Sequence, residues 1–75
     1  MAYLKADGFD AAIIGIDVLS ERLIYDKQKM VEILSAEMSV EDAIEFLEFN
    51  TWCAYVGEHT PIYVDVMGID EINDL

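Results

Sequence analysis

The chain is poor in the residues from which disulfides and metal centres are made. It has one Cys and one His among 75 residues, so an internal disulfide is excluded and the Cys and His ligands of a structural zinc site cannot be assembled. The calcium-loop spacing D-x-[DN]-x-[DN]-G is also absent. We therefore expect no metal and no cofactor, and the single thiol is typical of a reducing compartment.

Basic residues are absent from most of the chain. All four Lys and Arg residues lie before Met30, and the net charge of −12 comes mainly from the eleven acidic residues after it. A surface of this sign repels phosphate backbones, so direct nucleic-acid binding is disfavoured. A basic protein partner, a cation, or simple solubility are the interpretations that remain open.

Long apolar runs are missing too. No run approaches the ~20 residues of a membrane span, and the amino terminus lacks a basic segment followed by a hydrophobic one. We expect no membrane association and a cytoplasmic location. With 55% hydrophobic residues the chain is nevertheless too apolar for a disordered segment. Its length predicts a single domain over residues 1–75, with residues 1–8 and 68–75 frayed.

The apolar pattern predicts an α+β domain with three short strands. β-branched runs place them at residues 11–18, 22–25 and 60–66. The first two are expected to form a hairpin, although no Asn-Gly turn signal joins them. The strands hold more apolar residues than one sheet face needs, which favours a homo-oligomer through the open face or an edge strand.

Two helices are predicted between the second and third strands, which gives the order ββααβ. The first spans residues 27–37 with Asp26 as its N-cap, and the second spans residues 39–56 with Ser39 as its cap. We expect the helix pair to pack on one face of an antiparallel or mixed sheet. The inner face of the second helix is predicted to include Val40, Ala43, Ile44 and Leu47.

Four residues are predicted to shape the junctions between these elements: Asp26, Asn50, Gly57 and Pro61. Gly57 is expected to end the second helix in a left-handed conformation, and Pro61 to lead the third strand where no ladder donor is needed. Asn50 has poor helix propensity. Its amide is expected either to face solvent or, as we favour, to bond to backbone at residues 25–26 or at the Gly57 loop.

Three segments carry a resemblance: "DGFDAAIIG" at residues 7–15, "YDKQKMVEIL" at residues 25–34 and "MSVEDAIEFLEFNTWCAYVGEHTPI" at residues 38–62. There the chain resembles a family of small bacteriophage-encoded proteins with no established activity, whose members share D-G-F-x-x-A-I-I-G and E-F-N-x-x-x-A-[YW]-V-G-E-x-T-P. The resemblance implies an origin in a phage genome and action inside an infected bacterial cell. It implies no catalytic residue.

Cys53 and His59 form the one pairing suited to nucleophilic catalysis. A nucleophilic cysteine needs a base within hydrogen-bond reach and a third group that orients the base. The predicted place of Cys53 at a helix carboxyl end, in an acidic field, disfavours the thiolate. Members of the resembling family often have Gly at this position. We interpret Cys53 as a buried apolar residue and His59 as an exposed loop residue, and we expect no enzyme.

A row of carboxylates occupies one face of the predicted second helix. Glu41, Glu45 and Glu48 fall at i, i+4 and i+7, and Trp52 follows in line as an expected exposed aromatic anchor. The plain interpretation is a solvated face. The functional hypothesis is a surface that binds a host or phage protein, and the alternative is a DNA mimic whose carboxylates occupy the basic groove of a nucleic-acid-binding protein.

Overall fold

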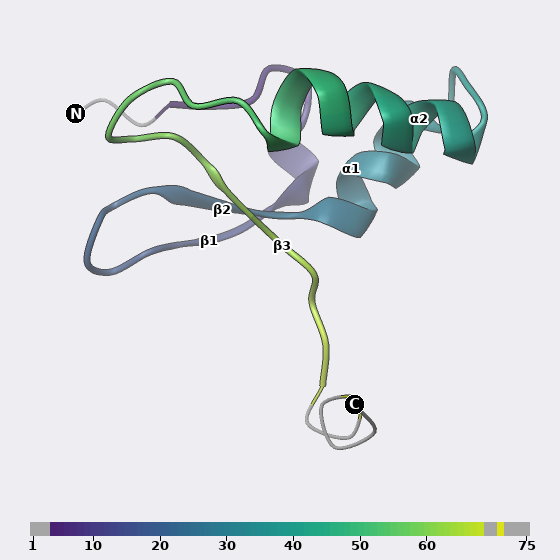
Figure 1. Ribbon diagram of the computed structural model, residues 1–75. Coiled ribbons are helices and arrows are strands. Elements are labelled where there is room, and N and C mark those ends of the chain that lie inside the picture. The colour runs from purple at the N-terminus through teal and green to yellow at the C-terminus, as the bar shows by residue number, and fades with distance from the viewer. Residues whose placement is uncertain (1–3, 69–70, 72–75) are drawn as a thin grey trace.

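The computed structural model describes residues 4–68 and 71, and it shows two helices beside a small three-stranded sheet (Figure 1). The elements in chain order are η1 (Asp10–Ala12), β1 (Ile13–Ile16), β2 (Leu23–Asp26), α1 (Lys27–Leu34), α2 (Val40–Leu47), η2 (Glu48–Trp52) and β3 (Ile62–Val64). η1 is a 3-10 turn and η2 is a π-helical turn. The predicted α+β class and the order ββααβ are confirmed.

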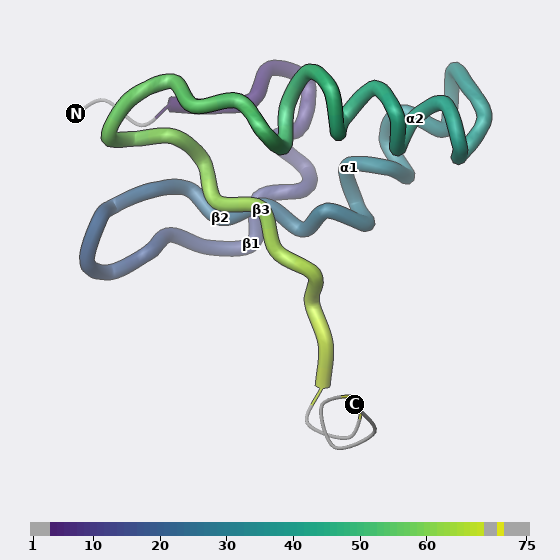
Figure 2. Tube along the Cα trace, viewed as in Figure 1, coloured from purple at the N-terminus to yellow at the C-terminus, as the bar shows by residue number. Residues whose placement is uncertain are grey.

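The sheet is mixed, with β2 between β1 and β3. β1 and β2 form the predicted antiparallel hairpin, and Ile14 bulges from the ladder between Ile13 and Gly15. β3 runs parallel to β2, which requires a long crossover, and α1 and α2 provide it. Figure 2 shows the chain returning from α2 through a long loop before it passes beside β2.

β1 and β3 are shorter than predicted and β2 is shifted by one residue, and the hairpin turn explains where β1 stops. The Asp17 carboxylate accepts hydrogen bonds from the backbone N–H of Ser20 at 2.7 Å and from its hydroxyl at 2.8 Å. Glu21 then takes a positive φ of 59°. An aspartate-centred turn thus replaces the absent Asn-Gly signal, because a short carboxylate can hold the backbone of a turn by itself. η1 occupies the start of the predicted first strand, and β3 covers only the middle of the third.

α1 begins as predicted and ends early. The Asp26 carboxylate accepts from the backbone N–H groups of Gln28 at 2.9 Å and Lys29 at 3.4 Å, so its N-cap role is confirmed. The helix ends at Leu34 instead of residue 37. The Ser35 hydroxyl donates to the Val31 carbonyl at 2.8 Å, a local bond that competes with continued helix.

α2 also begins as predicted and ends early. Its cap is Ser39, whose hydroxyl oxygen accepts from the Asp42 N–H at 3.1 Å. The helix gives way to η2 after Leu47, and residues 54–56 are not helical, so the prediction of a helix to residue 56 is wrong. The segment 49–53 consists of weak helix formers, which lowers the cost of leaving the α-helical path.

Asn50 helps to explain the change to a π turn. Its Nδ2 donates to the Phe46 carbonyl at 3.0 Å, and the side chain is exposed. The amide therefore competes with the backbone for an acceptor one turn earlier in the same helix. The favoured prediction, a bond to residues 25–26 or to the Gly57 loop, is wrong.

Gly57 has the predicted positive φ but a different role. With φ of 118° it opens a turn beyond η2 and does not terminate α2. The Thr60 hydroxyl donates to the Gly57 carbonyl at 2.6 Å and accepts from the Val56 N–H at 2.9 Å, which closes this turn. Pro61 follows, buried, directly before β3, in the position that was predicted for it.

The core is small and joins all the elements. Within the described residues, the buried cluster comprises Phe9, Ala12, Tyr25, Met30 and Leu47. The hydroxyl of Tyr25 accepts from the Ala6 N–H at 2.9 Å, which ties Ala6 to the core, and fraying of residues 1–8 stays a prediction. The predicted frayed ends comprise residues 1–8 and 68–75. Of these, the structure describes residues 4–8, 68 and 71, and the others lie outside the described residues.

Candidate binding groove

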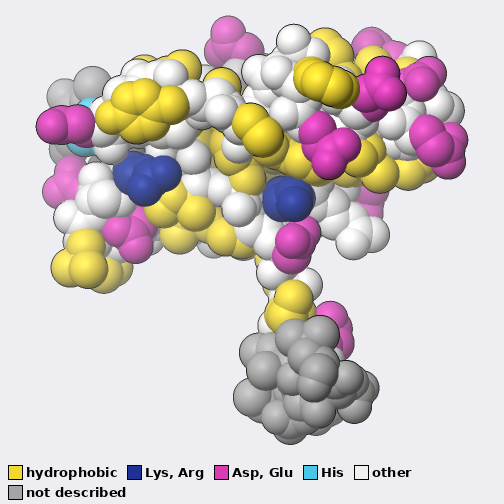
Figure 3. Space-filling model, viewed as in Figure 1, with side chains coloured by type: hydrophobic (Ala, Val, Ile, Leu, Met, Phe, Trp, Pro, Cys, Tyr) yellow, Lys and Arg dark blue, Asp and Glu magenta, His cyan; other side chains and the backbone are white. Residues whose placement is uncertain are grey.

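An apolar groove of about 790 Å³ lies between α1 and α2. Val31 of α1 faces Val40 and Ile44 of α2 across it, and Trp52 of η2 lies at one end. Figure 3 shows this side of the molecule, with a band of hydrophobic side chains between the two helices and carboxylates along its edges. We call this feature the α1–α2 groove.

The two apolar residues on the α2 wall were predicted to belong to the core. Val40 and Ile44 are instead 51% and 37% exposed. α1 covers the neighbouring residues Ala43 and Leu47, which are fully buried, and does not reach the next row of the helix surface. The predicted inner face of the helix was therefore too wide, and its outer part is a wall of the groove.

The carboxylates predicted as a binding surface border this wall. Glu48 lies one turn beyond Ile44 and lines the groove, while Glu41 and Glu45 follow on the adjoining face of α2. All three side chains are exposed, and we call them the acidic stripe. Glu32 stands on the opposite, α1 side of the groove. The structure thus brings an apolar trough and carboxylates together, a juxtaposition that helical spacing alone did not show.

Trp52 does not point outward as predicted. It is half-buried and packs against the core cluster. A π turn advances through fewer degrees per residue than an α turn, so the residue four positions after Glu48 is rotated away from the acidic stripe and toward α1. Phe49 of η2 is the exposed aromatic residue next to Glu48, with 82% of its surface accessible.

The indole of Trp52 has one polar atom without a partner. Its Nε1–H is shielded from solvent and, within the described part of the chain, no acceptor receives it. Over the ring lies the Lys27 ammonium, 4.5 Å from the ring centroid, in a cation–π contact.

Lys27 is the basic residue of the groove, and its charge is already engaged. Its Nζ lies 3.5 Å from the Asp65 carboxylate, just beyond β3, in addition to its contact with Trp52. The remaining carboxylates at the groove, Glu32 and Glu48, have no salt bridge among the described residues. The net charge of the groove is therefore negative.

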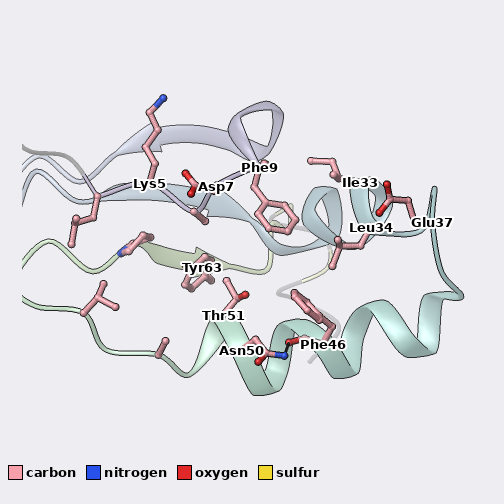
Figure 4. A pocket seen from close by; sticks show the side chains of 16 residues that line it. Lys5, Asp7, Phe9, Ile33, Leu34, Glu37, Phe46, Asn50, Thr51 and Tyr63 are labelled. Carbon is pink, nitrogen blue, oxygen red and sulfur yellow. Dashed lines mark hydrogen bonds between the residues drawn. The ribbon is translucent and has the colours of Figure 1, made fainter.

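A second cavity of about 740 Å³ lies on the other side of α2 (Figure 4). Phe9 and Leu34 face Phe46 and Thr51 across it. Tyr63 lines its inner end, and burial raises the pKa of this phenol, with a smaller contribution from Tyr25. The ring of Tyr63 packs on that of Tyr25, with centroids 5.6 Å apart, so Tyr63 acts here as a packing group.

Cys53 and His59 are both exposed, so the prediction of a buried Cys53 is wrong and that of an exposed His59 is confirmed. Between residues 4 and 68, no hydrogen bond links the thiol to the imidazole. Within the same described residues, no group of three or more His, Cys, Asp or Glu side chains is placed to hold a metal ion.

Comparisons with known proteins do not extend this description. No protein-family model, no curated protein and no solved structure matches the chain. Among the residues that the structure describes, no helix combines the length and apolar character needed to cross a membrane. The acidic stripe and the α1–α2 groove are therefore interpreted from their own chemistry.

Proposed function

We propose that this protein is a non-enzymatic protein-binding module that captures a basic protein in an infected bacterial cell. The observation that carries the proposal is the acidic stripe, Glu41, Glu45 and Glu48, exposed along the border of an apolar groove. Charge complementarity along such a border speeds encounter and sets register, while apolar burial supplies affinity. The cellular setting rests on the resemblance to small phage-encoded proteins.

The partner is proposed to be a protein because both parts of the surface suit one. A phosphate backbone would be repelled by the carboxylates. An apolar trough a few side chains wide accepts aliphatic or aromatic residues.

The second candidate is a DNA mimic that inhibits a nucleic-acid-binding protein. The repeated spacing of Glu41, Glu45 and Glu48 on one exposed face favours it. It differs from the first candidate in its targets: a mimic recovers proteins whose captured site also binds DNA, and DNA competes for them.

Capture from bacterial lysate on immobilised protein tests both candidates. The double variant Glu45→Lys with Glu48→Lys is expected to lose the captured protein, because it reverses the charge of the groove border. The variant Glu37→Lys with Glu58→Lys makes the same change in net charge at exposed positions elsewhere, and is expected to retain capture.

Three outcomes discriminate the candidates. Loss of capture in both double variants would mean that only total charge matters, which contradicts the proposed surface. Elution of the captured protein by duplex DNA would favour the mimic. Cys53→Ala is expected to leave capture unchanged, and loss of capture in this variant would place Cys53 in the contact surface.

A further inference from the structure

We propose that the α1–α2 groove receives an amphipathic helix of the partner, with the apolar face of that helix in the groove and its basic side chains beside the carboxylates. This inference rests on the proposed function and specifies the form of the bound segment. It is carried by the chemistry of the groove walls, by the charges around them and by the size of the trough.

The walls favour a helix over an extended segment. Both are helices, whose backbone groups are already bonded within α1 and α2. An extended guest lying between Val31 and Ile44 would find no backbone partner there, and its own buried N–H and C=O groups would remain unpaired. A helical guest satisfies its backbone internally and presents only side chains.

The dimensions limit the guest to a short segment. α1 and α2 have eight residues each, which corresponds to walls about 12 Å long. About two turns of helix fit beside such walls, so the guest inserts apolar residues spaced i, i+3 or i+4 and i+7. Val40 and Ile44, one turn apart on α2, are placed to contact successive residues of that series.

The charges specify a basic guest. Glu48 and Glu32 stand on opposite sides of the trough, and the remaining glutamates of the acidic stripe continue outward from the α2 side. Lys27 does not offset them, because Asp65 and the indole ring already engage it. A second copy of this chain, at a net charge of −12, is a poor occupant of the same trough.

Trp52 supplies both a contact and a signal. Its half-buried indole lines the groove and offers apolar surface to the guest. It is also the one Trp in the sequence, so its fluorescence reports directly on occupation of the groove.

Titration of the full chain with synthetic peptides tests the inference. The probe is a helical peptide of Leu and Lys with Leu at i, i+3 and i+4 and Lys on the other face. Its controls are a scrambled peptide of the same composition and an amphipathic peptide with Glu in place of Lys. We expect the amphipathic basic peptide to shift Trp52 emission and to bind at least tenfold more tightly than either control.

Variants of the protein locate the binding. Ile44→Asp is expected to weaken binding of the basic amphipathic peptide at least tenfold, and the matched change Phe49→Asp, on another face of the same helical segment, less than twofold. Circular dichroism verifies that each variant is folded. Val40→Asp, at a more exposed position, replaces Ile44→Asp if the latter unfolds, with the same expectation.

The outcomes separate this inference from the proposed function. Equal binding of the scrambled peptide, or equal weakening by Ile44→Asp and Phe49→Asp, would overturn the helix-in-groove inference while leaving capture through the acidic stripe intact. Retained lysate capture that the amphipathic peptide fails to displace would overturn it in the same way. Absence of both peptide binding and lysate capture would overturn the inference and the proposed function together.

Discussion

The β1–β2 hairpin and the α1–α2 pair both expose large apolar side chains, but they differ in charge. Val18 and Leu19 at the hairpin tip are 89% and 92% exposed, and the tip, residues 17–22, has Arg22 beside Asp17 and Glu21. The groove and the acidic stripe together have five carboxylates against Lys27: Glu32, Glu41, Glu45, Glu48 and Asp65. Similar apolar surfaces are therefore suited to different partners, because charge decides what can approach them.

Replacing one leucine in each region gives the largest expected contrast. Leu47→Ala truncates a fully buried side chain that α2 contributes to the core. It is expected to lower the free energy of unfolding by about 2–5 kcal/mol. Leu19→Ala makes the same chemical change at the exposed hairpin tip and is expected to alter it by at most about 0.5 kcal/mol. Urea denaturation measures both. Comparable losses would show that the hairpin tip is packed in solution.

Introducing a carboxylate at an exposed apolar position in each region should separate self-association from partner binding. Homo-oligomer formation through the open sheet face or an edge strand remains a prediction, and the hairpin tip, where Arg22 offsets one of two carboxylates, is where two copies at −12 each can best approach. We expect Leu19→Glu to reduce self-association several-fold in analytical ultracentrifugation, and Ile44→Glu to leave it unchanged. Higher salt should strengthen it, because screening weakens the repulsion between copies. A monomer at every salt concentration would refute this prediction.

The residue that joins the two regions should have an intermediate effect. Asp26 is the last residue of β2 and the N-cap of α1, with bonds to the Gln28 and Lys29 N–H groups. Asp26→Ala is expected to lower the free energy of unfolding by about 1 kcal/mol. Asp26→Ser, which retains a capping oxygen, should recover most of the loss. An equal loss in both variants would mean that the cap contributes little.

The smallest expected effects concern the pH dependence of stability, one in the hairpin and one in β3, the strand that follows the α1–α2 pair. In the hairpin, bonds from the Ser20 backbone N–H and then its hydroxyl lower the pKa of Asp17 below its usual 3.8. The folded state thus favours the carboxylate, and this contribution is present above about pH 4 and lost as the pH falls further. Asp17→Asn should flatten the acid side of the stability curve. An unchanged curve would contradict the turn geometry.

On the other side of the sheet, burial raises the pKa of Tyr63 above its usual 10.0. The folded state therefore keeps the phenol protonated, and stability is expected to fall as the pH rises above 10, where the unfolded chain releases the proton first. Tyr63→Phe should remove this alkaline decline. Absorbance of the phenolate, measured alongside the unfolding free energy, checks that the decline follows ionisation.

Local bonding made parts of the fold predictable. Asp26 and Ser39 cap their helices through bonds to backbone two or three residues away, and a pattern of that range is visible in the sequence. The Asp17 carboxylate also bonds to backbone three residues away, at Ser20. This turn was not predicted, because the sequence there has no Asn-Gly dipeptide. The weak helix formers from Phe49 to Cys53 were a signal for an early end of α2, and the continuing apolar periodicity concealed it.

The candidate site was predictable only in part. The positions of Glu41, Glu45 and Glu48 follow from helical spacing, and their exposure agrees with it. The inward rotation of Trp52 depends on the π turn, and the α1–α2 groove depends on how much of α2 is covered by α1. The groove depends on residues distant in the chain, whereas the π turn has local causes at residues 49–53 that the apolar periodicity concealed.

The sequence by itself determined the element order, the helix starts and the separation of charge, because these depend on composition or on contacts within about one turn of helix. Only the tertiary structure decided that Trp52 turns toward Lys27 and that Val40 and Ile44 face an open trough instead of the core. The physical reason is that burial of a side chain is set by the neighbour that covers it, and here that neighbour is a helix that ends at Leu34.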